Sequence, residues 1–488
     1  MRRKRRWLVG GVARPHGGNQ APAEGHGRTR EPRVRRLVLA LVAVVVVVRV
    51  ATVLAVSGGH PERAISHDSP GYVEPARSLL HDGDFDRSTG SSTPEFVRTP
   101  GYPAFVAAVY WPSGQSDRAV YVAQALLSGL TVALAVALGR RLTGSPSLGL
   151  LAGALTVLDP LQTTLPGTLG PEVLATTLVT AAAYAGVRFA QSDLAGRWGV
   201  AYGVALAAAT YVRPTTFYFA AVPLLLVAWE VVRRRLTWVV AWRAGLAVLA
   251  PCVVLLGMWN VRNHREVGSW RFSAVEAVNL YWYRAAGVVA EREGISFDDA
   301  QLRLTSELQA ELPHRGPRFD AAEYTSGLPP PAWEHRQGAY YGAAARRATT
   351  ILRAEPSTAS RQVAAGAYSQ VVQSGWVTAW SYLTGHRPPT LLSAIGLVTV
   401  WAVEGSALVG VVGVVRRRVA GGLAYALSLG MVAYTIVAGA GPEADAGYRF
   451  RVPIWPLWSV GAVVGIGVLL QIVNQVDFLA NRRDSQPH

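Results

Sequence analysis

Residues 37–57 read LVLALVAVVVVVRVATVLAVS, an apolar run that a single charged residue, Arg49, interrupts. A helix needs about 20 apolar residues to cross a ~30 Å hydrocarbon core, so this run predicts a transmembrane helix. It is too long for a typical signal sequence, which makes it a retained anchor. Arg49 either faces a helix-bundle interior or extends to the membrane surface, and the sequence leaves both interpretations open.

Nine further apolar runs of similar character follow the first one. They lie at 118–139, 145–160, 172–190, 198–212, 214–231, 238–259, 390–415, 419–440 and 452–475. A hydrophobic content of 50% with 16% charged residues also argues against a set of soluble domains. The sequence therefore predicts an all-α fold, a polytopic membrane bundle of about ten transmembrane helices.

The net charge of +16 is placed in a way that favours a membrane topology over a nucleic-acid partner. Basic clusters lie at 2–6, 33–36, 140–141, 233–235, 416–418 and 482–483, with Arg188 and Arg197 between them. All fall on one side if the spans alternate, and basic loops mark the cytoplasmic side. We therefore expect a multi-pass cell-membrane protein with both termini cytoplasmic. The loops at 58–117, 160–171, 260–389 and 441–451 then face outward.

This topology divides the chain into five parts. We expect a disordered basic cytoplasmic tail at 1–36, and a transmembrane bundle at 37–259 whose first outward loop, 58–117, is the catalytic one. A large extracytoplasmic loop at 260–389, C-terminal transmembrane helices at 390–476 and a cytoplasmic tail at 477–488 follow. Amphipathic surface helices are expected in the first outward loop and in the 260–389 loop, which is the fourth when the short outward turn at 211–214 is counted. Cys252 is the only cysteine, so no internal disulfide can form.

Charged residues of both signs gather at the outward edge of this topology. The carboxylates are Asp68, Glu172, Glu443 and Asp445, and the guanidiniums are Arg98, Arg213, Arg262, Arg449 and Arg451. A carboxylate can take a proton from a hydroxyl, and arginine forks suit phosphate oxygens. The alternative is that such residues only anchor the loops to lipid headgroups.

The order of short motifs resembles a known family. HDSPGY at 67–72 is followed by RTPGYP at 98–103, Pro171-Glu172, Arg213-Pro214, WNVRN at 259–263 and GYRFRVP at 447–453. This order is similar to that of integral-membrane glycosyltransferases of the GT-C fold, in the bacterial branch related to protein O-mannosyltransferases and lipid A aminoarabinose transferases.

The resemblance implies roles for the matching positions. Asp68 would be the catalytic base or a metal ligand, and Glu172 the second catalytic acidic residue. Donor-phosphate or substrate binding would fall to Tyr72, Glu95, Arg98, Arg213, Arg262, Tyr448, Arg449 and Arg451. The donor would be a polyprenyl-phosphate sugar, and the acceptor a glycan, lipid or protein at the membrane. A divalent metal, Mg²⁺ or Mn²⁺, held by Asp68 is left open.

The sequence also offers three competing interpretations. Asp82-Gly83-Asp84 has the DxD form that soluble glycosyltransferases use for nucleotide sugars, but it lies outside the membrane without a surrounding α/β pattern. We therefore expect a turn there. A transporter or flippase of lipid-linked saccharide is the alternative function, although the sequence shows no internal repeat of the kind that transporters carry. A non-catalytic scaffold would leave the polar first loop unexplained.

Overall fold

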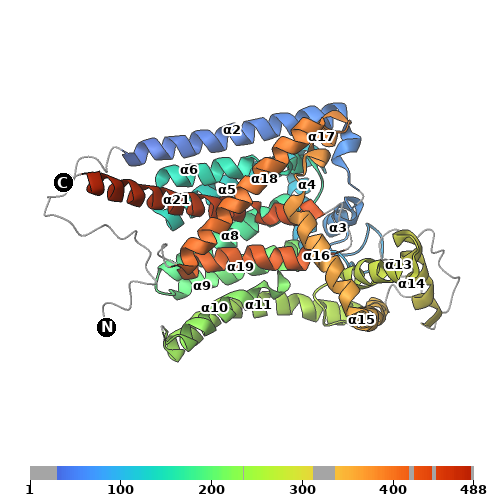
Figure 1. The fold of residues 1–488 in the computed structure, drawn as a ribbon. Coiled ribbons are helices and arrows are strands. Elements are labelled where there is room, and N and C mark those ends of the chain that lie inside the picture. The colour runs from blue at the N-terminus through green and yellow to red at the C-terminus, as the bar shows by residue number, and fades with distance from the viewer. Residues whose placement is uncertain are drawn as a thin grey trace.

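The computed structural model describes residues 30–66, 68–234, 236–311, 336–416, 422–441 and 447–484. Over these residues the chain is helical, and an isolated β-bridge between Asp86 and Pro94 is the only strand-like pairing. The predicted all-α fold is confirmed (Figure 1).

All ten predicted spans are helical over their described residues, and residues 419–421 of the ninth lie outside the described part of the chain. The spans are α2 (Arg30–Gly59), α5 (Asp117–Thr143), α6 (Pro146–Val157) with α7 (Pro160–Thr164), α8 (Glu172–Gln191), α9 (Gly196–Val212), η4 (Pro214–Ala220) with α10 (Ala221–Val232), α11 (Trp238–Val267), α18 (Thr390–Val415), α19 (Gly422–Gly439) and α21 (Trp455–Asp484). Within the described residues, 8 helices are long and apolar enough to cross a membrane, or 9 if the bent α6–α7 pair is one span. The remaining segment, α9, has 17 residues, about 26 Å at 1.5 Å per residue, so it is the short member of the bundle.

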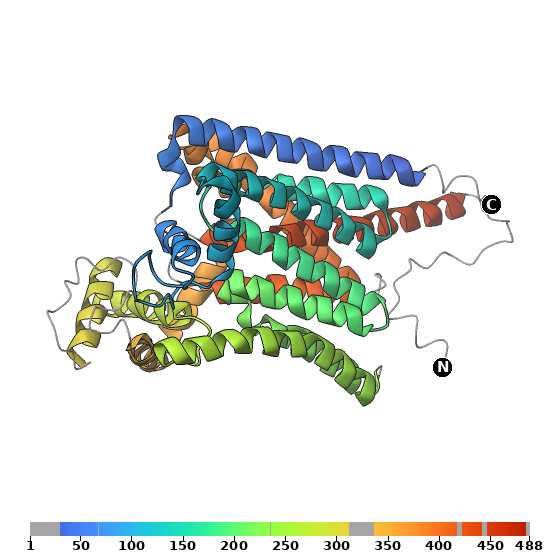
Figure 2. The same cartoon turned by 180° about the vertical axis from the view of Figure 1, so that it is seen from behind.

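Shorter helices make up the loops that the sequence predicts to face outward. They are η2 (Pro61–Ala64), α3 (Pro70–His81), α4 (Gly101–Ser113), η3 (Leu165–Gly167), α12 (Val275–Val278), the π-helix η5 (Asn279–Ala285), α13 (Ala286–Glu293), α14 (Phe297–Glu311), α15 (Gln337–Ala354), α16 (Pro356–Val372), α17 (Trp376–Thr384), α20 (Gly447–Arg451) and η9 (Val452–Ile454). Figures 1 and 2 show α3, α4 and α13–α17 gathered at one end of the long helices. The start of α2 and the end of α21 lie at the opposite end.

The two predicted tails are shorter than the sequence suggested. Residues 1–29 lie outside the described part of the chain, but 30–36 form the first turns of α2. At the other end, α21 continues to Asp484. Both helices therefore extend past their apolar runs into polar sequence at the same end of the bundle.

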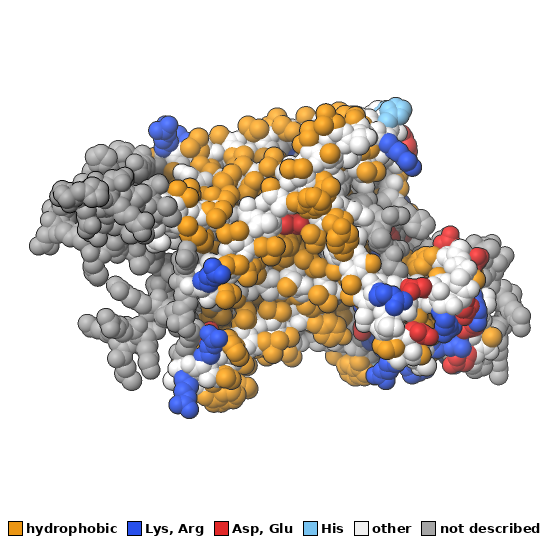
Figure 3. Space-filling model, in the orientation of Figure 1, with side chains coloured by type: hydrophobic (Ala, Val, Ile, Leu, Met, Phe, Trp, Pro, Cys, Tyr) orange, Lys and Arg blue, Asp and Glu red, His pale blue; other side chains and the backbone are white. Residues whose placement is uncertain are grey.

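Basic side chains mark that end. Arg140 and Arg141 close α5, Arg188 closes α8, and Arg233 and Arg416 follow the last residues of α10 and α18. Figure 3 shows an apolar face over the long helices with Lys and Arg along one edge and mixed charges at the other. This pattern is the one expected of a bundle set across a bilayer with its basic end cytoplasmic. Which end faces the cytoplasm stays a prediction.

The break between α6 and α7 places the segment that precedes α8. Pro160 has no N–H group to continue the helix, and Asp159 caps α7 by accepting a hydrogen bond from Leu161 N at 3.2 Å. The two helices meet at 76°. The chain then lies against the first outward loop, where Leu169 N donates to Ala64 O at 3.2 Å.

Four charged side chains lie inside the bundle, which the sequence did not show. Arg49, Asp159, Glu404 and Arg451 are each between 1% and 4% exposed. Arg451 Nη1 lies 4.0 Å from Glu404 Oε1, and Asp159 interacts electrostatically with both Arg451 and Arg49. Arg49 therefore faces the bundle interior, which decides between the two interpretations of that residue.

Single introduced cysteines test this topology. Ser92 in the first outward loop and Arg197 in the first turn of α9 are exposed at opposite ends, whereas the native Cys252 is buried at 4% exposure. In intact cells, a membrane-impermeant maleimide should label S92C and leave R197C unlabelled until the cells are permeabilised. Labelling of R197C from outside, or of both cysteines equally, would contradict the predicted orientation.

Candidate active site

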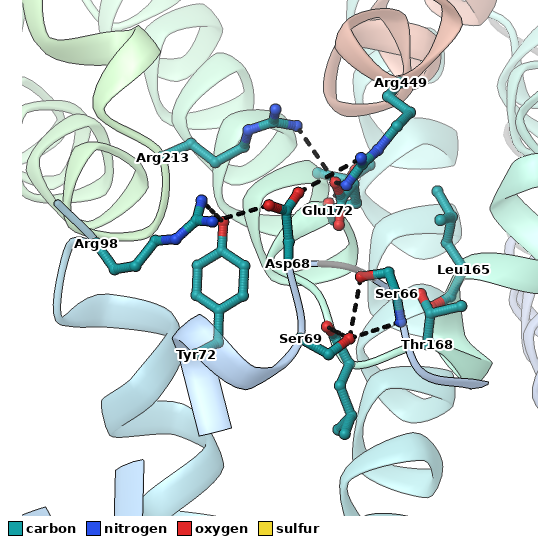
Figure 4. Close-up of polar contacts among 12 residues, drawn as sticks. Ser66, Asp68, Ser69, Tyr72, Arg98, Leu165, Thr168, Glu172, Arg213 and Arg449 are labelled. Atoms are coloured by element: carbon teal, nitrogen blue, oxygen red, sulfur yellow. Dashed lines mark hydrogen bonds and ion pairs between the residues drawn. The ribbon is translucent and has the colours of Figure 1, made fainter. Parts of the chain in front are cut away.

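Five charged side chains from distant parts of the chain meet at the end of the bundle that is predicted to face outward, here named the outer end (Figure 4). Asp68 precedes α3, Arg98 precedes α4, and Glu172 is the first residue of α8. Arg213 lies between α9 and η4, and Arg449 lies in α20. The convergence of the two carboxylates that the sequence led us to expect is therefore found in the structure.

Asp68 lies between two guanidiniums. Arg98 Nη2 donates to Asp68 Oδ1 at 2.8 Å, and Arg449 Nη1 lies 3.5 Å from Asp68 Oδ2. The Asp68 side chain is 32% exposed, so it can still be reached from outside. A half-buried carboxylate in this position can accept a proton from a bound hydroxyl.

Glu172 is the buried carboxylate of the site, with a side chain 3% exposed. Arg449 Nη2 donates to Glu172 Oε1 at 2.9 Å, and Arg213 Nη1 lies 3.9 Å from the same oxygen. Because a buried charge is costly without an opposite one, Glu172 determines where these arginines lie. Arg449 thus bridges Glu172 and Asp68.

Arg98 is held by aromatic and polar neighbours. Its Nη1 donates to the Tyr72 hydroxyl at 3.3 Å, and its guanidinium carbon lies 4.8 Å from the centre of the Tyr72 ring. Burial lowers the pKa of Arg98, but Tyr72 and Asp68 outweigh this and raise it above its ordinary value. Burial also raises the pKa of the Tyr72 hydroxyl, so this hydroxyl stays protonated at neutral pH.

The turn that carries Asp68 is fixed to the segment before Glu172. Ser69 Oγ donates to Leu169 O at 2.8 Å and accepts from Ser66 N at 2.9 Å. Gly71 lies under Arg98, since a Cβ there would be 3.1 Å from Arg98 Nε. Ser69 and Gly71 belong to the HDSPGY motif, but the motif alone did not say that they hold the two charged groups together.

Arg213 faces Glu172 without a hydrogen bond to it, since its Nη1 lies 3.9 Å from Glu172 Oε1. Its buried Nη1 makes no hydrogen bond within the described residues. Arg213 also lines a small cavity with the hydroxyl-bearing Thr215, Thr216 and Thr435, and the apolar side chains of Val179 and Phe450 complete much of the wall. A guanidinium beside apolar side chains suits an anion attached to an apolar chain.

Three predicted site residues point elsewhere. Arg262 donates to Glu95 O and Phe85 O, each at 2.9 Å, and Arg451 donates to Gln370 O at 2.8 Å inside the bundle. Glu95 accepts from the backbone N–H of Arg98 at 2.6 Å. These contacts are with backbone groups, so in this structure none of the three joins Asp68 and Glu172 at a common ligand position.

Some predicted residues lie outside the described part of the chain. These are His67, Glu443, Asp445 and the side chain of Tyr448. The DxD sequence, in contrast, is described and is a turn, as expected. Asp82 ends α3 and accepts from Gly90 N at 2.9 Å, and Gly83 has a φ of 78°.

The described residues do not provide a metal site of the usual kind. No group of three or more His, Cys, Asp or Glu side chains among them is placed to hold a metal ion. Both oxygens of Asp68 face guanidinium nitrogens, and a cation would have to displace these positive groups. The Mg²⁺ or Mn²⁺ site at Asp68 stays a prediction, and no step below depends on it.

Comparison with known proteins supports the resemblance for part of the chain. Residues 97–259 match the model of the family described as dolichyl-phosphate-mannose-protein mannosyltransferase. The resemblance to membrane glycosyltransferases is thus confirmed over the segment that carries Arg98, Glu172 and Arg213. None of the curated proteins matches the chain in sequence.

Three solved structures resemble the chain at low identity. ArnT from Cupriavidus metallidurans bound to undecaprenyl phosphate has a TM-score of 0.37 and 15% identity, over 92% of this chain and 81% of that one. AglB from Archaeoglobus fulgidus, in complex with an inhibitory peptide and a dolichol-phosphate, has a TM-score of 0.47 and 11% identity, over 92% and 52%. EmbB from Mycobacterium smegmatis has a TM-score of 0.32 and 16% identity, over 89% and 42%.

Substitution of Glu95 tests whether this residue acts as a hydrogen-bond acceptor for the backbone or is needed as a negative charge. Burial raises the pKa of the Glu95 carboxyl, although Arg87 and the Arg98 N–H oppose this. The folded state then binds the proton more tightly than the unfolded state does. Ionisation of Glu95 therefore lowers the free energy of unfolding progressively as pH rises from about 4.3 through the folded pKa. Glu95→Gln keeps the acceptor oxygen and should match or exceed the wild-type melting temperature at neutral pH, with the gain shrinking in acid.

Glu95→Ala is the matched comparison, because it removes the acceptor for the Arg98 N–H. This variant should melt at a lower temperature than E95Q. A melting temperature of E95Q clearly below that of the wild type at neutral pH would show that Glu95 is needed in its charged form. It would then again be a candidate for substrate binding.

Proposed function

We propose that this protein is a membrane glycosyltransferase that moves a sugar from a polyprenyl-phosphate donor to an acceptor hydroxyl at the extracytoplasmic face. The observation that carries the proposal is the bridge of Arg449 between Glu172 and Asp68, with Arg213 beside it. A site with a reachable carboxylate and two arginines next to an apolar bundle suits a lipid-linked phosphate and a hydroxyl. The family that matches residues 97–259 is described by a donor of this class, dolichyl-phosphate mannose.

In the proposed reaction, the acceptor oxygen forms a bond to the anomeric carbon of the donor sugar. The bond between that carbon and the phosphate oxygen breaks, and its electron pair leaves with the polyprenyl phosphate. Asp68 takes the proton of the acceptor hydroxyl. Arg449 and Arg213 neutralise the charge that develops on the leaving phosphate. Glu172 keeps both arginines in place.

The proposed position of the donor phosphate is between Arg213 and Arg449. The Nη1 of Arg213, which makes no hydrogen bond within the described residues, would donate to a phosphate oxygen, with Thr215 in the same wall. The polyprenyl chain would leave along the apolar wall that includes Val179 and Phe450. The acceptor, which could be a glycan, a lipid or a protein, would approach Asp68 from the outer side.

A transporter or flippase of lipid-linked saccharide is the second candidate. It is favoured by Arg49, Asp159, Glu404 and Arg451, since buried charges inside a membrane bundle often line transport pathways. Net movement of a lipid-linked sugar across proteoliposomes without any glycosidic product would support this candidate over the transferase.

Asp68→Asn tests the assignment of the base. The amide keeps the size and much of the hydrogen bonding of the carboxylate but cannot take a proton. We expect membrane insertion and yield to match the wild type, and kcat to fall about 100-fold or more, the usual size of a general-base contribution. The assay is transfer in membranes supplied with polyprenyl-phosphate sugars.

Asp84→Asn is the matched control for that assay, since Asp84 is an exposed aspartate of the same loop. It should transfer at the wild-type rate, and this result would also exclude a role for the DxD sequence. Wild-type turnover by D68N would remove Asp68 from the chemistry.

Arg449→Gln tests the phosphate assignment separately from stability. The single variant leaves the buried Glu172 with Arg213 alone, at 3.9 Å, and should destabilise the fold by about 3 kcal/mol or more. In R449Q/E172Q the poorly compensated carboxylate is gone, so thermal stability should return in part, although Arg213 then lacks its carboxylate partner. The KM for the donor should nevertheless stay at least roughly 10-fold raised, since a charge-assisted phosphate contact is lost. A donor KM that recovers together with stability would contradict the assignment.

A further inference from the structure

We propose that the large outward loop positions Arg98, and through Arg98 the base Asp68, by holding the backbone of residues 94–97. The part of the loop concerned is here named the outer cap: the outer end of α11 from Arg262 onward, together with α12–α15. This inference rests on the proposed function, because it gives the outer cap a task in that reaction. Arg262 and Gln337 are the positioning residues.

Four consecutive backbone carbonyls in the first outward loop each accept a hydrogen bond from the outer cap. The pairs are Gln337 Nε2 to Pro94 O at 2.8 Å, Arg262 Nη1 to Glu95 O at 2.9 Å, Ala274 N to Phe96 O at 2.9 Å and Ser273 Oγ to Val97 O at 3.2 Å. The four donors come from three separate parts of the outer cap: α11, the segment before α12, and α15. The backbone directly before Arg98 is therefore fixed along its whole length.

Side chains strengthen the same attachment. Phe96 is 1% exposed and Val97 is 6% exposed, and both belong to the hydrophobic core of the outer cap. The ring of Phe96 meets that of Tyr341 in α15 edge-on, with centroids 6.0 Å apart. Burial of a phenylalanine side chain contributes about 1.5–3 kcal/mol, so the segment is packed as well as hydrogen-bonded.

Arg262 joins two parts of the first outward loop. Its Nη1 and Nη2 donate to Glu95 O and Phe85 O, and Glu95 N donates to Phe85 O at 3.0 Å. Its guanidinium carbon also lies 4.9 Å from the centre of the Trp259 ring. A single side chain at the end of α11 thus holds the two segments around the Asp86–Pro94 bridge at a fixed place.

The attachment leads directly to the reacting groups. Arg98 N donates to Glu95 Oε1 at 2.6 Å, and Arg98 Nη2 donates to Asp68 Oδ1 at 2.8 Å. The arginine side chain is long, so the place of its backbone decides whether the guanidinium can hold Asp68 and Tyr72 together. Loosening residues 94–97 would release Arg98 without changing any group that touches the substrate.

The first experiment measures how firmly the backbone of residues 93–99 is held, without an activity assay. Hydrogen exchange of the full-length protein in detergent is compared for wild type and R262Q/Q337A. The matched control is R265Q, because Arg265 is exposed one turn along the same helix. The double variant should exchange the amides of residues 93–99 at least about 10-fold faster, as expected when two backbone-anchoring hydrogen bonds are lost, while peptides from α5 and α8 are unchanged. R265Q should match the wild type.

The second experiment asks whether the effect on transfer passes through Arg98. R262Q/Q337A should lower kcat/KM about 10-fold in the wild-type background. In the R98Q background the same pair should lower it less than about 2-fold, because neighbouring residues that act through one group are not additive. Lysine at position 262 can still donate to a carbonyl. R262K/Q337A should therefore lose less kcat/KM than R262Q/Q337A.

The two experiments separate this inference from the proposed function. Unchanged exchange of residues 93–99 in R262Q/Q337A would overturn the positioning role whatever the activity. A loss of transfer that is equally large with and without Arg98 would also overturn it, since a general effect on folding behaves in that way. If the wild-type protein shows no transfer, but exchange of residues 93–99 is still faster in R262Q/Q337A, only the transferase proposal is contradicted.

Discussion

The structure of the outer site depends on one buried carboxylate, Glu172. Its side chain is 3% exposed at the first turn of a membrane helix, where a lone charge would be costly. Arg449 and Arg213 offset that cost, and each comes from a different region of the chain. Arg449 then has a second nitrogen directed at Asp68. A single requirement for charge balance thus brings the first outward loop, α8, the turn after α9 and the segment before α21 to one place.

The arginine-rich segment of α20 serves two charge groups at once. Arg449 faces the outer site, whereas Arg451 extends into the bundle towards Gln370 and Glu404. Successive helical residues are about 100° apart, so two residues separated by one position lie on nearly opposite sides. Arg451 is therefore a structural link between α16 and α18, and its buried position helps to fix the segment that presents Arg449.

The sequence predicted the features that depend on local composition. Each span is visible as an apolar run, and charge bias predicted which helix ends lie together, so the fold class and the common edge of Asp68, Glu172 and the arginines could be inferred. It could not distinguish Arg449 from Arg451, or recognise that Arg262 bonds to carbonyls of a loop about 170 residues earlier. Those facts depend on helix rotation and on long-range packing. The bend at Asp159-Pro160 and the buried Glu404 depend on tertiary partners in the same way.

The account is tested most directly by a cryo-EM map of the protein with a polyprenyl phosphate added in lipid nanodiscs. The phosphate density should contact the guanidiniums of Arg213 and Arg449 at the outer end of α8, with the Asp68 carboxylate beside it and the chain running along the apolar wall at Val179. A phosphate bound at the level of Arg49 and Glu404 inside the bundle, or at a site that neither Arg213 nor Arg449 contacts, would contradict the proposed site.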